Sequence, residues 1–353
     1  MIISKSRQRT DLLRGPLLLL HPESESPQGA IRDCPPWLTG RRVEDEVYAN
    51  QTLRPIRVES LPMQGALSFV LLVSLFGSPE KSSCTATGDL EIVPFESRVF
   101  PVQRNLRILL PAGYRLLENR HRRYPVLYLN DGQNLFDVCT SQFTGEEWRV
   151  DETVDDLISH GAISPIIVVG IDNGGKRWRP REYLPYVDDT LAPPEPNPEG
   201  KRYPRFLLEE VVPFVESQYR VLPGAGNRTL GGASYGAEIA FYTVVQHPAS
   251  FGGLLLESPS VYADDYHVLK DAESVRVWPH RIFIGTGTVN EPVEDVERLK
   301  KLLQKSGLGP EQLQVVVQQG AGHSEKWWAG RLPNALRFLF GPTANSQSVG
   351  SKP

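Results

Sequence analysis

The sequence predicts an α/β fold in which a mostly parallel central sheet is covered by helices on both faces. From about residue 91, apolar runs of strand length alternate with segments of helical period, which is typical of parallel strands joined by helical crossovers. The run at 165–171 is apolar on both faces, which indicates a strand in the interior of the sheet. One domain spanning 91–340 accounts for the whole pattern.

The expected elements follow one another regularly along the chain. The predicted strands cover 104–110, 124–129, 165–171, a segment ending at Leu230, 254–256, 281–284 and 315–317. The predicted helices cover 150–160, 206–219, a segment from about Tyr235, 293–303 and a segment after His323. Pro213 predicts a kink in the second of these helices. Two polar stretches, 172–203 and 262–280, follow the carboxyl ends of predicted strands, where open α/β sheets bind ligands.

The composition excludes several classes of protein. The chain has 353 residues and a net charge of -4, which leaves no basic footprint, so nucleic acid is not expected as a partner. Cys34, Cys84 and Cys139 are too few for a disulfide framework or a cysteine-rich metal site. No cluster of His, Asp and Glu has metal-ligand spacing, and 285–290 lacks the third glycine of a dinucleotide fingerprint. The sequence therefore predicts neither a metal nor a cofactor.

The N-terminal part differs from the rest of the chain. Residues 1–62 have neither helical nor strand period, which predicts a disordered or wrongly assigned extension. Met63 precedes an uncharged, mostly apolar run at 66–77, and the segment 63–88 is predicted to be a signal-peptide-like stretch followed by a linker. A short buried helix is the alternative for the run. We expect an exported protein, periplasmic or secreted, without stable membrane insertion after processing; a cytoplasmic protein is the alternative. The small, polar segment 341–353 is expected to be a disordered tail.

A serine motif carries the predicted chemistry. Gly232-Ala233-Ser234-Tyr235-Gly236 has the pattern G-x-S-x-G, in which a serine projects from a sharp strand-to-helix turn. The pattern alone is weak, because a structural serine in a glycine-rich turn also matches it. Here an apolar strand precedes the motif and a helical segment follows it, which is the setting that the chemistry requires.

A serine hydroxyl needs a base, and the base needs a carboxylate to fix its tautomer. Of seven histidines, His323 lies on a loop after the last predicted strand, at the same edge of the sheet as Ser234. Glu291 follows the strand 281–284, whereas Glu294 and Asp295 suit the first turn of the next helix. The order serine, acid, histidine is the order of α/β-hydrolases.

A tetrahedral intermediate also needs two N–H donors. The backbone of Tyr235, directly after the serine, is one candidate. The other is expected from the loop after the strand 124–129, and Gln133 is our choice there, although Asp131-Gly132 also reads as an ordinary turn.

These residues belong to a wider pattern. The domain resembles the putative esterase family of α/β-hydrolases, which groups esterase D, enterochelin esterases, feruloyl esterase domains and the antigen 85 mycolyltransferases. The resemblance spans about 95–340 and implies Ser234 as nucleophile, His323 as base, Glu291 as acid and Gln133 as the second oxyanion donor. The chain departs from the family at Ala237, where members often have a second glycine. The matching stretches are 109–114, 124–136, 168–173, 181–185, 210–215, 232–236, 285–291 and 322–323 with Trp327 and Trp328.

The sequence thus predicts a serine carboxylic-ester hydrolase that acts through an acyl-enzyme on Ser234. An acyltransferase of the antigen 85 type and a non-catalytic binding module on a hydrolase fold are the alternatives. Trp178, Tyr183, Tyr186 and Trp327 are candidate substrate-binding residues, although aromatic side chains on loops often only pack. The expected partner is a small-molecule or saccharide-linked ester. The oligomeric state and the role of the proline-rich stretch 190–200 stay open.

Overall fold

The computed structural model describes residues 83–142, 145–291 and 293–342. The predictions for 1–62, for most of the segment 63–88 and for 343–353 lie outside these residues. No helix in the described ranges has the length and apolar character needed to cross a membrane.

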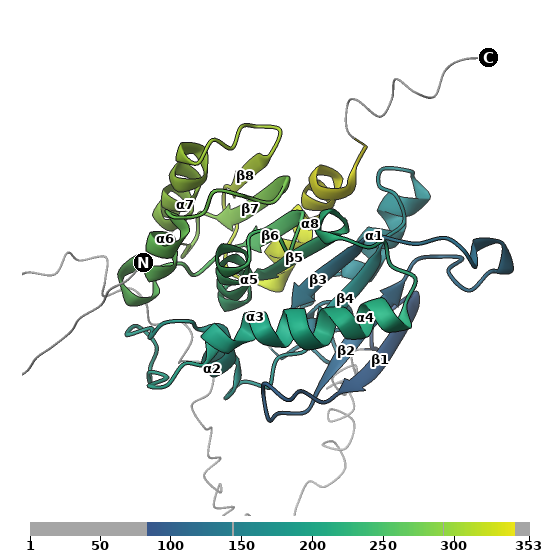
Figure 1. The fold of residues 1–353 in the computed structure, drawn as a ribbon, viewed down its shortest axis with the longest axis horizontal. Coiled ribbons are helices and arrows are strands. Elements are labelled where there is room, and N and C mark those ends of the chain that lie inside the picture. The colour runs from purple at the N-terminus through teal and green to yellow at the C-terminus, as the bar shows by residue number, and fades with distance from the viewer. Residues whose placement is uncertain (1–82, 143–144, 292, 343–353) are drawn as a thin grey trace, which may run out of the picture. The chain divides into compact units, whose positions relative to one another are not determined.

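The described chain forms one eight-stranded sheet with the order β1-β2-β4-β3-β5-β6-β7-β8 (Figure 1). The strands β3 to β8 run parallel to one another, whereas β2 is antiparallel to both of its neighbours, β1 and β4. The predicted, mostly parallel sheet is therefore confirmed. The strands are β1 (Asp89–Phe95), β2 (Arg104–Leu110), β3 (Val126–Asn130), β4 (Ile167–Ile171), β5 (Arg228–Ala233), β6 (Gly253–Glu257), β7 (Arg281–Gly287) and β8 (Leu313–Gln318).

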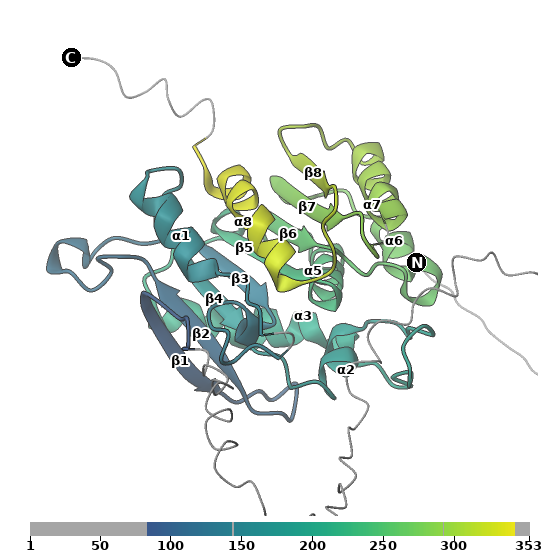
Figure 2. The ribbon, with the colours of Figure 1, turned by 180° about the vertical axis from the view of Figure 1, so that it is seen from behind.

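Helices cover both faces of the sheet. The helices α3, α4 and α5 lie over the face seen in Figure 1, and α1 and α8 lie over the opposite face seen in Figure 2. Each face has its own apolar cluster, and β4 is fully buried between them, as its two apolar faces predict. The α-helices are α1 (Val150–Ser159), α2 (Arg179–Tyr183), α3 (Tyr203–Phe206), α4 (Val212–Gln218), α5 (Tyr235–Gln246), α6 (Ala263–Ala272), α7 (Val293–Lys305) and α8 (Glu325–Phe340).

The structure differs from the sequence prediction in three places. The strand β1 was not predicted, because its partly exposed residues lack a long apolar run. The predicted helix 206–219 is divided by a π-helical turn, Leu207–Val211, which ends directly before Pro213 and α4. The polar stretches 172–203 and 262–280 contain α2 and α6, and the first turn of α6 is interrupted by left-handed residues. The π-helical turn before α4 is explained by Pro213, which has no backbone N–H to donate.

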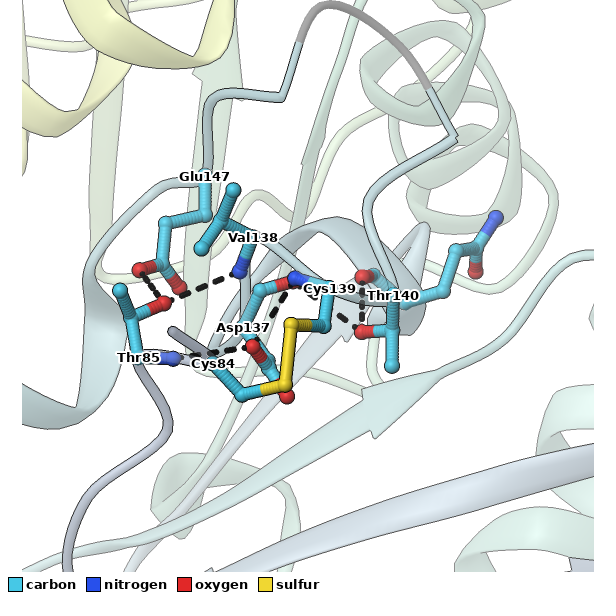
Figure 3. The surroundings of a disulfide bond; sticks show 8 residues. Cys84, Thr85, Asp137, Val138, Cys139, Thr140 and Glu147 are labelled. Carbon is cyan, nitrogen blue, oxygen red and sulfur yellow. Dashed lines mark hydrogen bonds between the residues drawn. A yellow bond between two sulfur atoms is a disulfide. The ribbon is translucent and has the colours of Figure 1, made fainter. Parts of the chain in front are cut away.

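The described residues contain one disulfide bond, between Cys84 and Cys139, which the cysteine count does not predict (Figure 3). The segment around Cys84 is also held by hydrogen bonds: the backbone N of Thr85 donates to Asp137 at 3.1 Å, and the backbone N of Thr87 donates to Asp151 at 2.6 Å. Residues 84–87 are therefore attached to the domain.

Candidate active site

Ser234 lies at the junction between β5 and α5, as the sequence predicts. Its backbone has φ 55° and ψ -128°, a conformation that residues other than glycine rarely adopt. The neighbouring strand β6 helps to fix this turn, since the Ser234 amide donates to the carbonyl of Glu257 at 2.9 Å. A Cβ atom on Gly232 would lie 2.5 Å from the carbonyl oxygen of Gly236, so only glycine fits there. The turn thus exposes the Ser234 hydroxyl at the carboxyl edge of the sheet.

The predicted histidine and carboxylate are in contact. His323 Nδ1 lies 3.1 Å from Glu291 Oε2. The Glu291 side chain is fully buried, whereas 29% of the His323 side chain is exposed. Because an ionised carboxylate only accepts hydrogen bonds, the pair places a proton on Nδ1 and leaves Nε2 able to accept one.

Backbone contacts hold the two loops that carry this pair. The amides of Thr288 and Val289, after β7, both donate to the carbonyl of Ala321, at 3.0 and 2.9 Å. A Cβ on Gly287 would lie 2.1 Å from the same carbonyl oxygen, which explains the glycine at this close approach. The loops after β7 and β8 therefore form one unit. Glu294 and Asp295 lie in the first turn of α7, as predicted.

The serine and the histidine are not joined directly. In the described part of the chain, no hydrogen bond links the Ser234 hydroxyl to His323; Ser234 Oγ lies 3.5 Å from Ser260 Oγ. Such contacts are often long in free enzymes and shorten when substrate binds. The structure thus brings His323 to Glu291, and both to the sheet edge at which Ser234 stands.

The two predicted oxyanion donors lie in the first turns of the helices that follow β3 and β5. Gln133 lies in the 3-10 helix η4 (Gly132–Asn134), and Tyr235 is the first residue of α5. Amides in a first turn have no acceptor inside their helix, so they can bind an anion. The end of β3 contacts the serine turn, because the Asn130 side chain donates to the carbonyl of Gly236 at 2.7 Å.

A buried ion pair supports the loop that contains Gln133. Arg179 donates from Nε and Nη2 to the two carboxylate oxygens of Asp131, at 2.9 and 2.8 Å. Only 12% of the Arg179 side chain and 10% of the Asp131 side chain are exposed. Burial disfavours the guanidinium charge, but Asp131 more than offsets this, so the pKa of Arg179 lies above its ordinary value. Asp131 has φ 59°, and this pair therefore holds a left-handed turn in place.

A second carboxyl group lies beside this loop. Glu325, in the first turn of α8, is buried and accepts a hydrogen bond from the Asn134 side chain at 3.1 Å. Burial, with a smaller contribution from the nearby Asp131, raises the pKa of Glu325 to about 7, although a backbone hydrogen bond and the charges of Arg179 and His323 lower it. The carboxyl group therefore titrates close to neutral pH.

The four predicted substrate-binding aromatics have different environments. Tyr183 is completely buried, and its hydroxyl accepts a hydrogen bond from the amide of Asp131, so it supports the loop that follows β3. Tyr186 is half-buried and stacks on His267, with ring centroids 4.0 Å apart. Trp178, directly before α2, and Trp327, in the first turn of α8, are both half-buried. Of the four, Tyr186, Trp178 and Trp327 are accessible to a ligand, and Tyr183 is not.

The sequence prediction missed several residues of the site. Ser258 and Ser260 follow β6, and Arg179 opens α2 inside a stretch predicted to be polar and irregular. Their position directly after a predicted strand was the available signal for the two serines. Among the described residues, the one group with metal-ligand spacing is Cys84, Asp137 and Cys139, and its two sulfur atoms are joined in the disulfide.

Known proteins resemble this chain in sequence and fold. The chain is 27% identical over 233 residues to the uncharacterized protein YjcH of Bacillus subtilis, covering 62% of this chain and 85% of YjcH. It is 24% identical over 268 residues to an endo-1,4-beta-xylanase/feruloyl esterase of Xylanibacter ruminicola, covering 72% of this chain and 31% of that longer protein. The crystal structure of the enterobactin esterase FES from Shigella flexneri matches with a TM-score of 0.56 and 18% identity, covering 72% of this chain and 60% of that one.

The sheet, its covering helices and the strand-to-helix turn at Ser234 define an α/β-hydrolase fold. The signature of the family described as Putative esterase matches residues 97–339. The chain belongs to this family, which confirms the resemblance seen in the sequence.

Proposed function

We propose that this esterase-family protein is a serine carboxylic-ester hydrolase with Ser234 as nucleophile, His323 as general base and Glu291 as acid. The observation that carries the proposal is the backbone of Ser234, at φ 55° and ψ -128° between β5 and α5. Such a strained conformation at a half-buried serine on a strand-to-helix turn is typical of a nucleophile. The hydrogen bond between His323 and the buried Glu291 carboxylate supports the assignment of the other two residues.

The proposed reaction proceeds through an acyl-enzyme. His323 Nε2 accepts the proton of Ser234 Oγ while Oγ bonds to the ester carbonyl carbon. The carbonyl oxygen becomes an oxyanion, which accepts hydrogen bonds from the amides of Gln133 and Tyr235. The C–O bond to the alcohol then breaks, and the imidazolium returns its proton to the leaving oxygen. Water repeats these steps on the acyl-enzyme and releases the acid.

A fluorophosphonate probe tests the nucleophile. Such probes form a covalent bond with an activated serine, so the full chain should be labelled and Ser234→Ala should not. Labelling that survives in Ser234→Ala would assign the nucleophile to another residue. If the well-folded wild-type protein is not labelled at all, the chain is a binding module on a hydrolase fold and the proposal fails.

The triad acid has a matched control in the next helix. Glu291→Gln keeps the size of the side chain but removes the charge that stabilises the imidazolium, so kcat should fall by about 100-fold or more. Glu294→Gln changes an acidic residue in the first turn of α7 and should leave kcat unchanged. Equal losses in the two variants would contradict the role of Glu291.

We propose a small-molecule or saccharide-linked ester as the substrate. Trp178, Tyr186 and Trp327 are half-buried, and their aromatic rings suit an aromatic acyl or alcohol group. Relatives are named as feruloyl esterase and siderophore enterobactin esterase, so esters of both classes are the first substrates to screen.

We also propose that the protein is exported. The apolar run 66–77 has the length of the central region of a signal peptide, and the disulfide bond between Cys84 and Cys139 suits an oxidising compartment. Mass spectrometry of the mature N-terminus in the natural host tests this. Recovery of peptides from 1–62 would contradict it.

A further inference from the structure

Two residues outside the proposed triad form a short series of hydrogen bonds that ends on its carboxylate. The Ser258 hydroxyl donates to Glu291 Oε1 at 2.6 Å, on the oxygen that His323 does not use. The indole N–H of Trp328 donates to Ser258 Oγ at 3.0 Å. Ser258 and Trp328 are 2% and 6% exposed, so water does not compete freely for these hydrogen bonds.

The hydrogen bonds that link Trp328, Ser258 and Glu291 can run in one direction only. An indole nitrogen only donates, and an ionised carboxylate only accepts. The Ser258 hydroxyl must therefore accept from Trp328 and give its single proton to Glu291. The remaining carboxylate oxygen accepts from His323 Nδ1. The order of donation from Trp328 through Ser258 to Glu291 is fixed.

Trp328 also contacts His323, the residue at the other end of this series of hydrogen bonds. Trp328 lies five residues after His323, and its indole packs edge-on against the imidazole, with ring centroids 5.2 Å apart and an interplanar angle of 81°. One tryptophan thus touches the histidine ring directly and the carboxylate through Ser258. Rotation of the His323 imidazole is therefore restricted both by its hydrogen bond to Glu291 and by its packing against Trp328.

The backbone of Ser258 is also unusual. Its φ is 44°, in the left-handed region, and its amide donates to the carbonyl of Gly285 at 2.7 Å. A non-glycine residue in this region is strained, and such strain is concentrated at functional positions. The conformation directs the Ser258 side chain from the end of β6 towards the loop after β7.

We propose that Ser258 and Trp328 are positioning residues that orient the Glu291 carboxylate, and through it the imidazole of His323, for proton transfer. The inference rests on the proposed function of the Ser234 site. Neither residue exchanges a proton with substrate. Their role is to prevent rotation of the carboxylate, because a misplaced base slows transfer without weakening substrate binding.

The experiment compares Ser258→Ala, Trp328→Phe and the double variant with the wild-type full chain. Trp328→Phe keeps an aromatic ring beside His323 but removes the N–H donor together with one ring of the indole. Trp278→Phe is the matched control, because Trp278 is also buried and its indole nitrogen has no hydrogen-bond partner within the described residues. The readouts are kcat and KM per fluorophosphonate-titrated site, and the NMR signal of the His323 Nδ1 proton.

We expect each single variant to lower kcat by about 10-fold, as for the loss of one hydrogen bond to a charged group, with KM changed less than about twofold. The double variant should be no slower than Ser258→Ala, because both changes break the same chain of contacts. The Nδ1 proton signal should shift or broaden in both single variants and stay unchanged in Trp278→Phe.

Two results would overturn the inference: unchanged kcat and Nδ1 signal in Ser258→Ala, or losses in the two single variants that multiply in the double variant. If Ser258→Ala does not fold, Trp328→Phe and its control decide alone. Failure of the proposed function is seen separately, as absence of Ser234-dependent labelling in the wild-type protein.

Discussion

Asn134 donates a hydrogen bond from its side-chain amide to the Glu325 carboxyl group, with 3.1 Å between Nδ2 and Oε1. The carbonyl oxygen of the same amide accepts from the amide of Gln142 at 2.9 Å. The loop that follows β3 is thus held by a buried carboxyl group whose pKa is raised to about 7, first by burial. Its stability should therefore depend on pH.

Glu325 should make the free energy of unfolding fall as pH rises from about 4.5 to 7. Its pKa is raised from 4.5 in the unfolded chain to about 7 in the folded protein, so the stabilisation is complete below pH 4.5 and is lost as pH rises through 7. The shift corresponds to about 3 kcal/mol. Glu325→Gln can still accept from Asn134 but cannot ionise. It should be more stable than wild type at pH 8 and should lose this part of the pH dependence, measured by urea unfolding at pH 5 and pH 8.

Other buried carboxyl groups contribute to the same pH range, since burial also raises the pKa of Glu257 to about 7. The contribution of Glu325 is therefore taken as the difference in pH dependence between wild type and Glu325→Gln. Glu311→Gln, at an exposed position, is the control and should follow wild type. Parallel curves for wild type and Glu325→Gln would exclude the role given to Glu325.

Arg179→Met should strongly destabilise the protein. It leaves the buried Asp131 carboxylate without its cationic partner, and breaking a buried ion pair in this way costs about 3–5 kcal/mol. Arg205→Met is the matched control, because Arg205 and Glu209 form an exposed pair at 2.8 Å. Urea unfolding at pH 7 compares them. A small effect of Arg179→Met would show that the pair does not stabilise the loop after β3.

Reduction of the disulfide bond should lower stability. The bond between Cys84 and Cys139 closes a loop with a sequence separation of 55, and crosslinks of this kind contribute about 2–4 kcal/mol. Thermal unfolding with and without dithiothreitol measures the effect. The double variant with Cys84→Ser and Cys139→Ser should match the reduced wild type and should not respond to dithiothreitol. A response of the double variant would point to another target of the reductant.

Gly232→Ala should disrupt the serine turn. The new Cβ would lie 2.5 Å from the carbonyl oxygen of Gly236, and such overpacking costs about 1–3 kcal/mol. Fluorophosphonate labelling of Ser234 should fall together with stability. Gly330→Ala, in α8, meets no atom within 4 Å and should stabilise the protein by about 0.4–1 kcal/mol. Normal labelling of Gly232→Ala would mean that the turn tolerates a side chain there.

The parts of the fold that follow from local pattern could be predicted from the sequence. β4 is an uninterrupted apolar run, and G-x-S-x-G marks the junction between β5 and α5. β1 could not be recognised, because its stability comes from pairing with β2 and not from a buried face of its own. Arg179 and Ser258 carry no motif; their roles depend on partners more than 30 residues away in the sequence. The disulfide bond was missed because a cysteine count does not reveal spatial proximity.

The crosslink between Cys84 and Cys139 has a consequence for proteolysis. It encloses an exposed stretch that includes Leu116 and Leu117, which are 53% and 75% exposed. A protease that cuts there leaves two pieces that stay covalently joined. A nicked molecule would therefore migrate as one intact chain on a denaturing gel until a reductant separates the fragments.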